Sequence, residues 1–166
     1  MPWAPLTVGS RRAMTQSANL CTGVHRIDLP PGPEAASAAR EFVAAWSTGC
    51  GQGNVVDVLR LVASELVGNA VRHAGGARSI SCVVGDQGVV VEVVDGGAPF
   101  ALGVEPPADD RDCCGRGLFL VWAMGCGLGS GPVRGGGKWV RAVISGELVL
   151  DETQFVQPGP PDRAGR

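Results

Sequence analysis

The 166-residue sequence predicts one α+β domain, a two-layer sandwich in which helices pack on one face of a sheet. Two segments place apolar residues at the spacing of three and four that an amphipathic helix requires. Several shorter segments either alternate apolar and polar residues or are apolar throughout, as strands are. These segments follow one another in the order strand, helix, helix, strand, strand, loop, helix, strand, strand.

The first strand and the first helix occupy residues 24–51. Residues 24–30 (VHRIDLP) alternate apolar and polar side chains, which is typical of a half-buried strand. Pro33 and Glu34 suit a helix start, because proline fits the first turn and a carboxylate stabilises the positive end of the helix dipole. Glycines at 49 and 51 end this helix. Its apolar positions are Ala36, Ala39, Phe42, Val43 and Trp46.

A second helix is expected over residues 54–74, with Asn54 as its N-cap and Gly75-Gly76 at its end. Two strands follow at 79–84 and 89–95, joined by the turn GDQG. The second strand is apolar at nearly every position, so we expect it in the middle of the sheet. The apolar stripe of the helix consists of Val55, Val58, Leu59, Val62, Leu66 and Ala70.

A long segment without periodicity, residues 96–116, is rich in Gly, Pro and Asp and predicts a loop. Loops of this length in a compact domain are usually functional lids or disordered. A short apolar helix is expected over 117–125, and a final strand over 138–148. The expected organisation is a flexible segment at 1–23, one domain at 24–146 and a disordered tail at 147–166.

Composition excludes several classes of partner and site. The formal net charge is −2 and no run of Lys or Arg is present, which argues against nucleic acid or an anionic membrane as a partner. No apolar run approaches the ~18 residues of a membrane helix, and no signal-peptide pattern is present, so we expect a cytoplasmic protein. The six cysteines contain no C-x-x-C pair, so zinc is not expected. Disulfides are not expected in a reducing cytosol. Cys82 and Cys126 lie among apolar residues and are expected in the core.

Two familiar phosphate-binding motifs are absent from the sequence. The P-loop pattern fails because Pro132 stands at its first glycine and Trp139 follows Lys138. The dinucleotide pattern G-x-G-x-x-G fails at Gly125, where the sixth residue is Ser130. A nucleotide site of either kind is therefore not supported.

A different set of polar and glycine residues does fit a nucleotide. Glu65 and Asn69 are four residues apart, so they project from one face of the second helix. The Asn69 amide oxygen is a suitable ligand for Mg²⁺, and Glu65 could accept a proton from an attacking hydroxyl or water. Asp95, at the end of a buried strand, could accept a hydrogen bond from the exocyclic amine of adenine. Gly97 has no Cβ to prevent a flat ring from approaching the backbone.

The start of the short helix completes this set. Gly115 and Gly117 would expose N–H groups at a helix N-terminus, where anions are favoured, and Arg116 could pair with a phosphate. Each feature alone has a simpler explanation: a solvated helix face, a turn or a helix entry, and for His73 a surface or capping position. Their conjunction in this order favours a nucleotide site.

These segments resemble the motifs of one known family. The sequence SELVGNAVRHA resembles the N-box, VVDGGAP the first glycine box and GRGLFLV the second glycine box of the GHKL, or Bergerat, ATPase fold. The chain is most similar to the small histidine-kinase-like ATPases of the bacterial anti-sigma factor and serine-protein kinase group. The resemblance covers residues 24–146.

The resemblance implies a mixed, mostly antiparallel sheet backed by helices, with ATP and Mg²⁺ held between the helices and a lid. It implies that Asn69 is the metal ligand, Glu65 the catalytic base and Asp95 the adenine acceptor. Gly97, Gly115 and Gly117 match the positions where the backbone of the family approaches the nucleotide. Arg116 and Leu118, in the second glycine box, are also expected to bind the nucleotide.

The implied function is that of an anti-sigma factor that phosphorylates a serine or threonine of an antagonist protein and thereby releases a sigma factor. Related proteins often dimerise, so the resemblance leaves both a monomer and a homodimer open. In this family the last strand often begins Gly-Lys-Thr, whereas Trp139 follows Lys138 here, and Gly68 stands where threonine is common. The alternative is therefore a catalytically inactive module of the same fold that binds a regulatory partner.

Overall fold

A computed structural model describes residues 23–100 and 116–145 of the chain. The segment expected to be flexible (1–23), the expected tail (147–166) and most of the expected loop (96–116) lie almost entirely outside these residues. The elements are β1 (His25–Asp28), α1 (Glu34–Gly49), η2 (Gly53–Val55), α2 (Val56–Ala74), β2 (Ala77–Gly85), β3 (Gly88–Asp95), α3 (Arg116–Ala123), β4 (Gly127–Pro132) and β5 (Lys138–Ile144).

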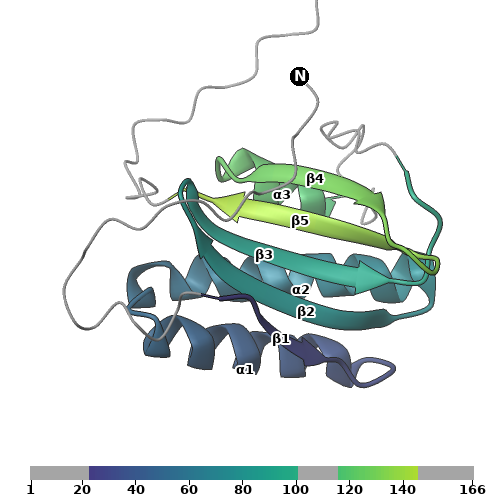
Figure 1. Ribbon diagram of the computed structural model, residues 1–166, viewed down its shortest axis with the longest axis horizontal. Helices are drawn as coiled ribbons and strands as arrows, with labels where there is room; N and C mark the ends of the chain where they lie inside the picture. Colours follow the sequence, from purple (N-terminus) through teal and green to yellow (C-terminus); the bar gives the residue numbers. More distant parts are fainter. Residues whose placement is uncertain (1–22, 101–115, 146–166) are drawn as a thin grey trace, which may run out of the picture.

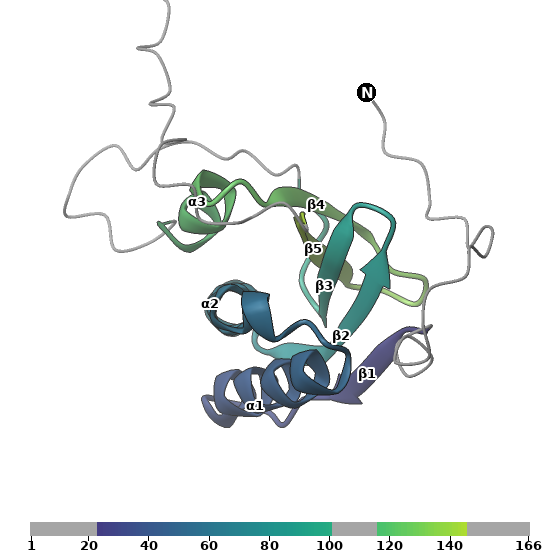
Figure 2. The same ribbon diagram turned by 90° about the vertical axis from the view of Figure 1, so that its left-hand side faces the viewer.

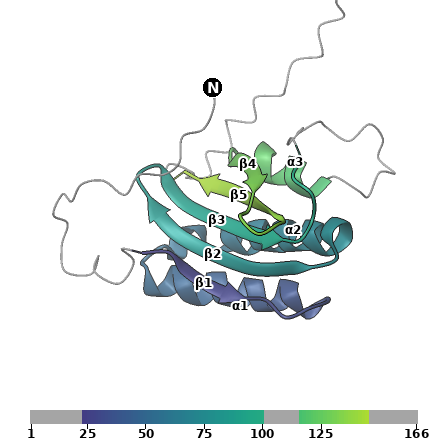
Figure 3. The same cartoon turned by 45° about the vertical axis from the view of Figure 1, so that its right-hand side comes forward.

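The strands form one sheet in the order β1-β2-β3-β5-β4, and all four pairings are antiparallel. The three α-helices lie on one face of this sheet, and α3 lies beyond α2 at the edge that β4 forms (Figures 1, 2 and 3). The predicted two-layer α+β sandwich with helices on one face is confirmed. The sheet was expected to be mixed, with mostly antiparallel pairs. Among the described strands no parallel pair occurs, so the sheet is antiparallel throughout.

The two long helices begin and end close to the predicted positions. Helix α1 starts after Pro33, and the left-handed Gly75, with φ of +72°, caps the end of α2. The predicted N-cap of α2 is wrong, because Asn54 lies in the 3₁₀ turn η2 and Val55 is the N-cap, with no side-chain hydrogen bond. The buried residues of α2 recur at helical spacing, which explains why this face packs on the sheet. They are Leu59, Val62, Ala63, Leu66, Val67 and Ala70.

Strand β3 lies in the middle of the sheet, as its apolar sequence predicts. It pairs with β2 on one side and β5 on the other. Alternate residues of β5 are buried beneath the helices, and the residues between them lie on the opposite face. Asp95 and Lys138 are directly opposite in the β3–β5 register, so both occupy the helix-covered face.

Strand β4 has the sequence GLGSGP, which carries little strand-forming signal of its own. It is an edge strand held by pairing with β5, and Pro132 stands at its end, where a missing donor does least harm. The ring of Trp139 covers Gly129 and Gly131, so that a Cβ on Gly131 would come within 2.6 Å of the indole. An aromatic ring over edge glycines supplies the packing that glycine lacks.

Cys82 and Cys126 are buried in the apolar core, as predicted. Burial raises the pKa of Cys82 to about 12 and that of Cys126 to about 11. Cys50, which follows α1, is disulfide-bonded, so the expectation of no disulfide is wrong there.

Within the described residues, every helix is too short or too polar to cross a membrane.

Candidate functional site

A cavity of about 390 Å³ opens on the helix-covered side of the sheet, a volume within the usual range of small-molecule sites. Its walls come from α2, the end of β3, the start of β5 and α3. The cavity is lined by Leu66, Asn69, Ala70, His73, Asp95, Ala98, Phe100, Leu118, Lys138 and Val140.

The most buried polar group of the cavity is a cross-strand ion pair. Asp95 is 2% exposed and Lys138 is 5% exposed. The Lys138 Nζ lies 2.7 Å from Asp95 Oδ1, and the backbone N–H of Gly97 donates to the same oxygen at 2.8 Å. A buried carboxylate is tolerated only when it is paired and hydrogen-bonded, and both conditions hold here.

Two glycines are required by the close packing around this pair. A Cβ on Gly97 would lie 2.5 Å from Lys138 Nζ and 3.0 Å from the Cβ of Ala74. Gly137 has φ of +98°, and its Cβ would overlap the backbone oxygen of Asp95. Gly97 therefore makes room for the Lys138 ammonium, in addition to the approach of a flat ring that its sequence position predicts.

Three polar residues of α2, spaced four apart, share one face of the helix: Glu65, Asn69 and His73. Asn69 and His73 line the cavity. The Arg72 guanidinium donates from Nη2 to Asn69 Oδ1 at 2.8 Å, so it occupies one acceptor position of the expected metal ligand. A Cβ on Gly68 would lie 3.3 Å from Arg72 Nη1, which gives Gly68 a packing role beneath that guanidinium.

Glu65 lies where α2 meets α3, one turn from Asn69, and is not among the residues that line the cavity. A Cβ on Gly117 would overlap the Glu65 carboxylate, so the first turn of α3 packs directly against this side chain. Leu118, the next residue, lines the cavity. Gly115 and the side chain of Arg116 lie outside the described residues.

The structure therefore brings Asn69, Asp95 and Leu118 to one cavity and places Glu65 and Gly97 beside it. Sequence reasoning did not select Lys138 or Phe100 for the site. Lys138 is the only lysine of the chain, a feature of the sequence that could have drawn attention to it. Its position opposite Asp95 follows only from the strand register. Phe100 lies with its ring centroid 5.4 Å from Lys138 Nζ, and its carbonyl accepts a hydrogen bond from Ser130 Oγ at 2.8 Å.

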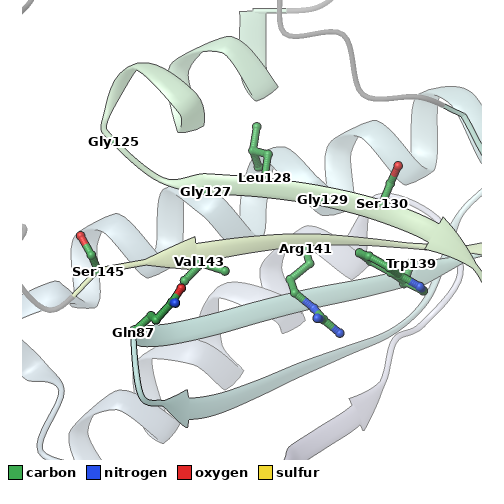
Figure 4. Close-up of a pocket in the computed structure, with 10 residues that line it drawn as sticks. All are labelled: Gln87, Gly125, Gly127, Leu128, Gly129, Ser130, Trp139, Arg141, Val143 and Ser145. Carbon is green, nitrogen blue, oxygen red and sulfur yellow. The ribbon is translucent and has the colours of Figure 1, made fainter. Parts of the chain in front are cut away.

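A second cavity, of about 310 Å³, lies over β4 and β5 (Figure 4). Its lining includes Trp139, Arg141 and Val143, which project from the face of β5 opposite to Lys138. The single charged side chain among the described residues that line it is Arg141, which is already paired with Glu92. Trp139 thus does not line the site that contains Asp95.

The side chains that line the first cavity fit a purine nucleotide and Mg²⁺. Both described contacts of the Asp95 carboxylate fall on Oδ1, which leaves Oδ2 for a ligand, and the apolar side chains of Leu66, Leu118 and Val140 suit a flat ring. The described residues include no cluster of three or more His, Cys, Asp or Glu that could hold a metal. Mg²⁺ needs no such cluster, since it commonly takes one or two protein oxygens together with phosphates and water.

Comparison with known proteins identifies one family. The family model for the histidine kinase-like ATPase domain matches residues 29–143. A comparison with curated protein sequences found no match. The matched range contains every residue that lines the first cavity.

Proposed function

The chain belongs to the histidine kinase-like ATPase domain family, and from this premise we propose that it is an ATP-binding anti-sigma factor that phosphorylates an antagonist protein on serine or threonine. The family membership itself implies ATP binding. The sigma factor and the antagonist are the partners that we propose, and the cytoplasm is the compartment in which they would act.

One observation carries the proposal more than any other. Asn69 and Asp95 come from α2 and from the end of β3, twenty-six positions apart in the printed sequence, yet they line the same cavity. The site thus offers both an amide oxygen and a buried carboxylate, which suits a ligand with a metal-bound phosphate group and a base. Apolar walls between them would exclude water from the base.

Each residue would have a distinct task in phosphate transfer. Asn69 would hold Mg²⁺, which would neutralise charge on the phosphates during transfer. The Glu65 carboxylate would accept the proton of the attacking hydroxyl, and its contact with Gly117 would fix its position at the α2–α3 boundary. Asp95 would accept a hydrogen bond from the adenine amine through Oδ2.

The central test compares Glu65→Gln with the matched control Glu41→Gln, which changes an exposed glutamate on α1. The acceptor would be the protein that co-purifies with the chain from its native cell in an ATP-dependent manner. We expect Glu65→Gln to lose transfer of labelled γ-phosphate by roughly a hundredfold or more while its affinity for Mg²⁺-ATP stays within about twofold. The control should match the wild type in both respects. Equal transfer by wild type and Glu65→Gln would remove Glu65 from the role of base.

A second candidate function is a partner-binding module without kinase activity. The hydrogen bond from Arg72 to Asn69 Oδ1 favours it, since a guanidinium at this oxygen competes with a metal ion. Calorimetric titration with ATP, with and without Mg²⁺, tests the kinase proposal against this module. The kinase proposal requires binding that Mg²⁺ strengthens, so an absence of measurable binding with Mg²⁺ present would contradict it and favour the module.

A further inference from the structure

The Lys138 ammonium is the one strong hydrogen-bond donor that the described part of the cavity presents beside the Asp95 carboxylate. It belongs to the only lysine in the chain and is almost completely buried. A buried cation that served only to neutralise Asp95 would not need to lie at the surface of a cavity, yet Lys138 lines it. This position makes the ammonium available to whatever the cavity holds.

Two contacts hold the ammonium, and a glycine leaves room for it. Asp95 Oδ1 accepts from Nζ at 2.7 Å, and the Phe100 ring lies 5.4 Å away, a distance suited to a cation–π interaction. Gly97 leaves the space that a side chain would otherwise fill, since its Cβ would come within 2.5 Å of Nζ. An ammonium has three N–H donors, and the Asp95 bond uses one, so donors remain for a ligand.

Together Lys138 and Asp95 form a donor and an acceptor side by side. The Watson–Crick edge of adenine carries the complementary pair, because the N6 amine donates and the adjacent ring atom N1 accepts. Guanine in the same pose presents the reverse pair, with a carbonyl at position 6 and an N–H at position 1. Such mispairing of buried polar groups discriminates strongly between ligands.

We propose that Lys138 is a specificity-determining residue that donates a hydrogen bond from Nζ to adenine N1 while Asp95 Oδ2 accepts from the N6 amine. The inference rests on the proposed function, since it requires that the cavity bind ATP. Lys138 would thus contact the ring nitrogen directly through a charged donor, in addition to the acceptor at Asp95. It also explains why the only lysine of the chain is buried at this point.

The experiment uses the full chain and three nucleotides in calorimetric titration: ATP, 1-deaza-ATP, which has C–H in place of N1, and GTP. Loss of one hydrogen bond from a charged donor predicts that 1-deaza-ATP binds roughly ten- to a hundredfold more weakly than ATP. GTP should bind at least about a hundredfold more weakly, because the guanine carbonyl would face the Asp95 acceptor and the guanine N–H would face the Lys138 donor. Binding of 1-deaza-ATP or GTP within about twofold of ATP would overturn the inference.

A second readout needs no substitution. Labelling with ¹⁵N-lysine gives one side-chain signal, which reports Lys138 alone. ATP should shift the Nζ resonance, and 1-deaza-ATP should leave it near its position in the free protein. An Nζ resonance that responds equally to both nucleotides would contradict a hydrogen bond to N1.

A variant separates recognition from folding. Lys138→Met alone would leave Asp95 buried without its partner, so we pair it with Asp95→Asn, which keeps a carbonyl acceptor for the N6 amine. In this double variant the preference for ATP over 1-deaza-ATP should shrink to within about twofold; an unchanged preference would overturn the inference. Absence of any ATP binding to the wild type would overturn the proposed function and this inference together, whereas ATP binding without discrimination would overturn the inference alone.

Discussion

Replacing Lys138 with methionine is expected to lower the free energy of unfolding by about 3–5 kcal/mol, because it leaves the Asp95 carboxylate buried without a counter-ion. Both side chains are nearly inaccessible, with side-chain exposures of 6% and 3%, so water cannot replace the lost partner. Methionine keeps most of the apolar stem of lysine and removes the terminal ammonium with its charge and donors. The substitution therefore tests the ion pair with little change in apolar packing.

The magnitude follows from the geometry. At the observed 2.7 Å and an effective dielectric constant of about 20, the Coulomb attraction is about 6 kcal/mol. Desolvation of the two ions costs several kcal/mol each, so the net contribution of the intact pair is small. Removing one partner forfeits the attraction and keeps the desolvation cost of the other. The double variant Lys138→Met with Asp95→Asn removes both charges and should lie within about 2 kcal/mol of the wild type.

Urea unfolding followed by tryptophan fluorescence measures these differences. With a slope of about 1–3 kcal/mol per molar urea, the midpoint of Lys138→Met should fall by at least about 1 M. The control is Arg60→Met, which breaks an exposed ion pair with Asp57 at 3.6 Å and should cost less than about 1 kcal/mol. If the losses of unfolding free energy in the single variants Lys138→Met and Asp95→Asn add up to the loss in the double variant, the two side chains do not interact and the ion pair contributes nothing to stability.

Three further predictions concern the neighbourhood of the site and the core. Gly117→Ala should displace the Glu65 carboxylate, because its Cβ would overlap that group, and should reduce phosphate transfer at least about tenfold while ATP affinity, measured by calorimetry, stays within about twofold. Arg72→Ala should free the Asn69 oxygen and strengthen the Mg²⁺ dependence of ATP binding in the same assay; weaker Mg²⁺ dependence would contradict the competition. Burial raises the pKa of Cys82 from 9.0 to about 12, so the unfolded chain loses this proton first and the free energy of unfolding should fall by about 1.4 kcal/mol per pH unit between those values, with no effect below pH 9. Cys82→Ala should flatten that slope in urea titrations, and an unchanged slope would exclude this thiol as its cause.

Helical periodicity and strand hydrophobicity predicted most of the fold. The apolar stripe of α2 and the continuous run in β3 require burial, so both elements could be placed on the core from sequence alone. The motif residues Asn69 and Asp95 could be selected because their chemistry is specific and their order is unusual. Their presence in one cavity agrees with that selection, while their roles remain proposals.

The remaining features depend on tertiary contacts that no local pattern encodes. The sequence GLGSGP does not define the bounds of β4, because this strand is held by pairing with β5 and by the ring of Trp139. Asn54 has the side chain of an N-cap, yet the turn η2 shifts the start of α2 past it. The place of Lys138 in the site, with Trp139 on the opposite face, follows from the β3–β5 register, which was not predicted.

The most direct test of the central claim is a crystal structure of the chain with Mg²⁺ and a non-hydrolysable ATP analogue. We expect the adenine to lie against Asp95 and Lys138 and the metal ion to be bound by the Asn69 oxygen, with Arg72 moved away from it. A nucleotide bound instead in the cavity beside Trp139 and Arg141, or with its base remote from Asp95, would show that the proposed site is wrong.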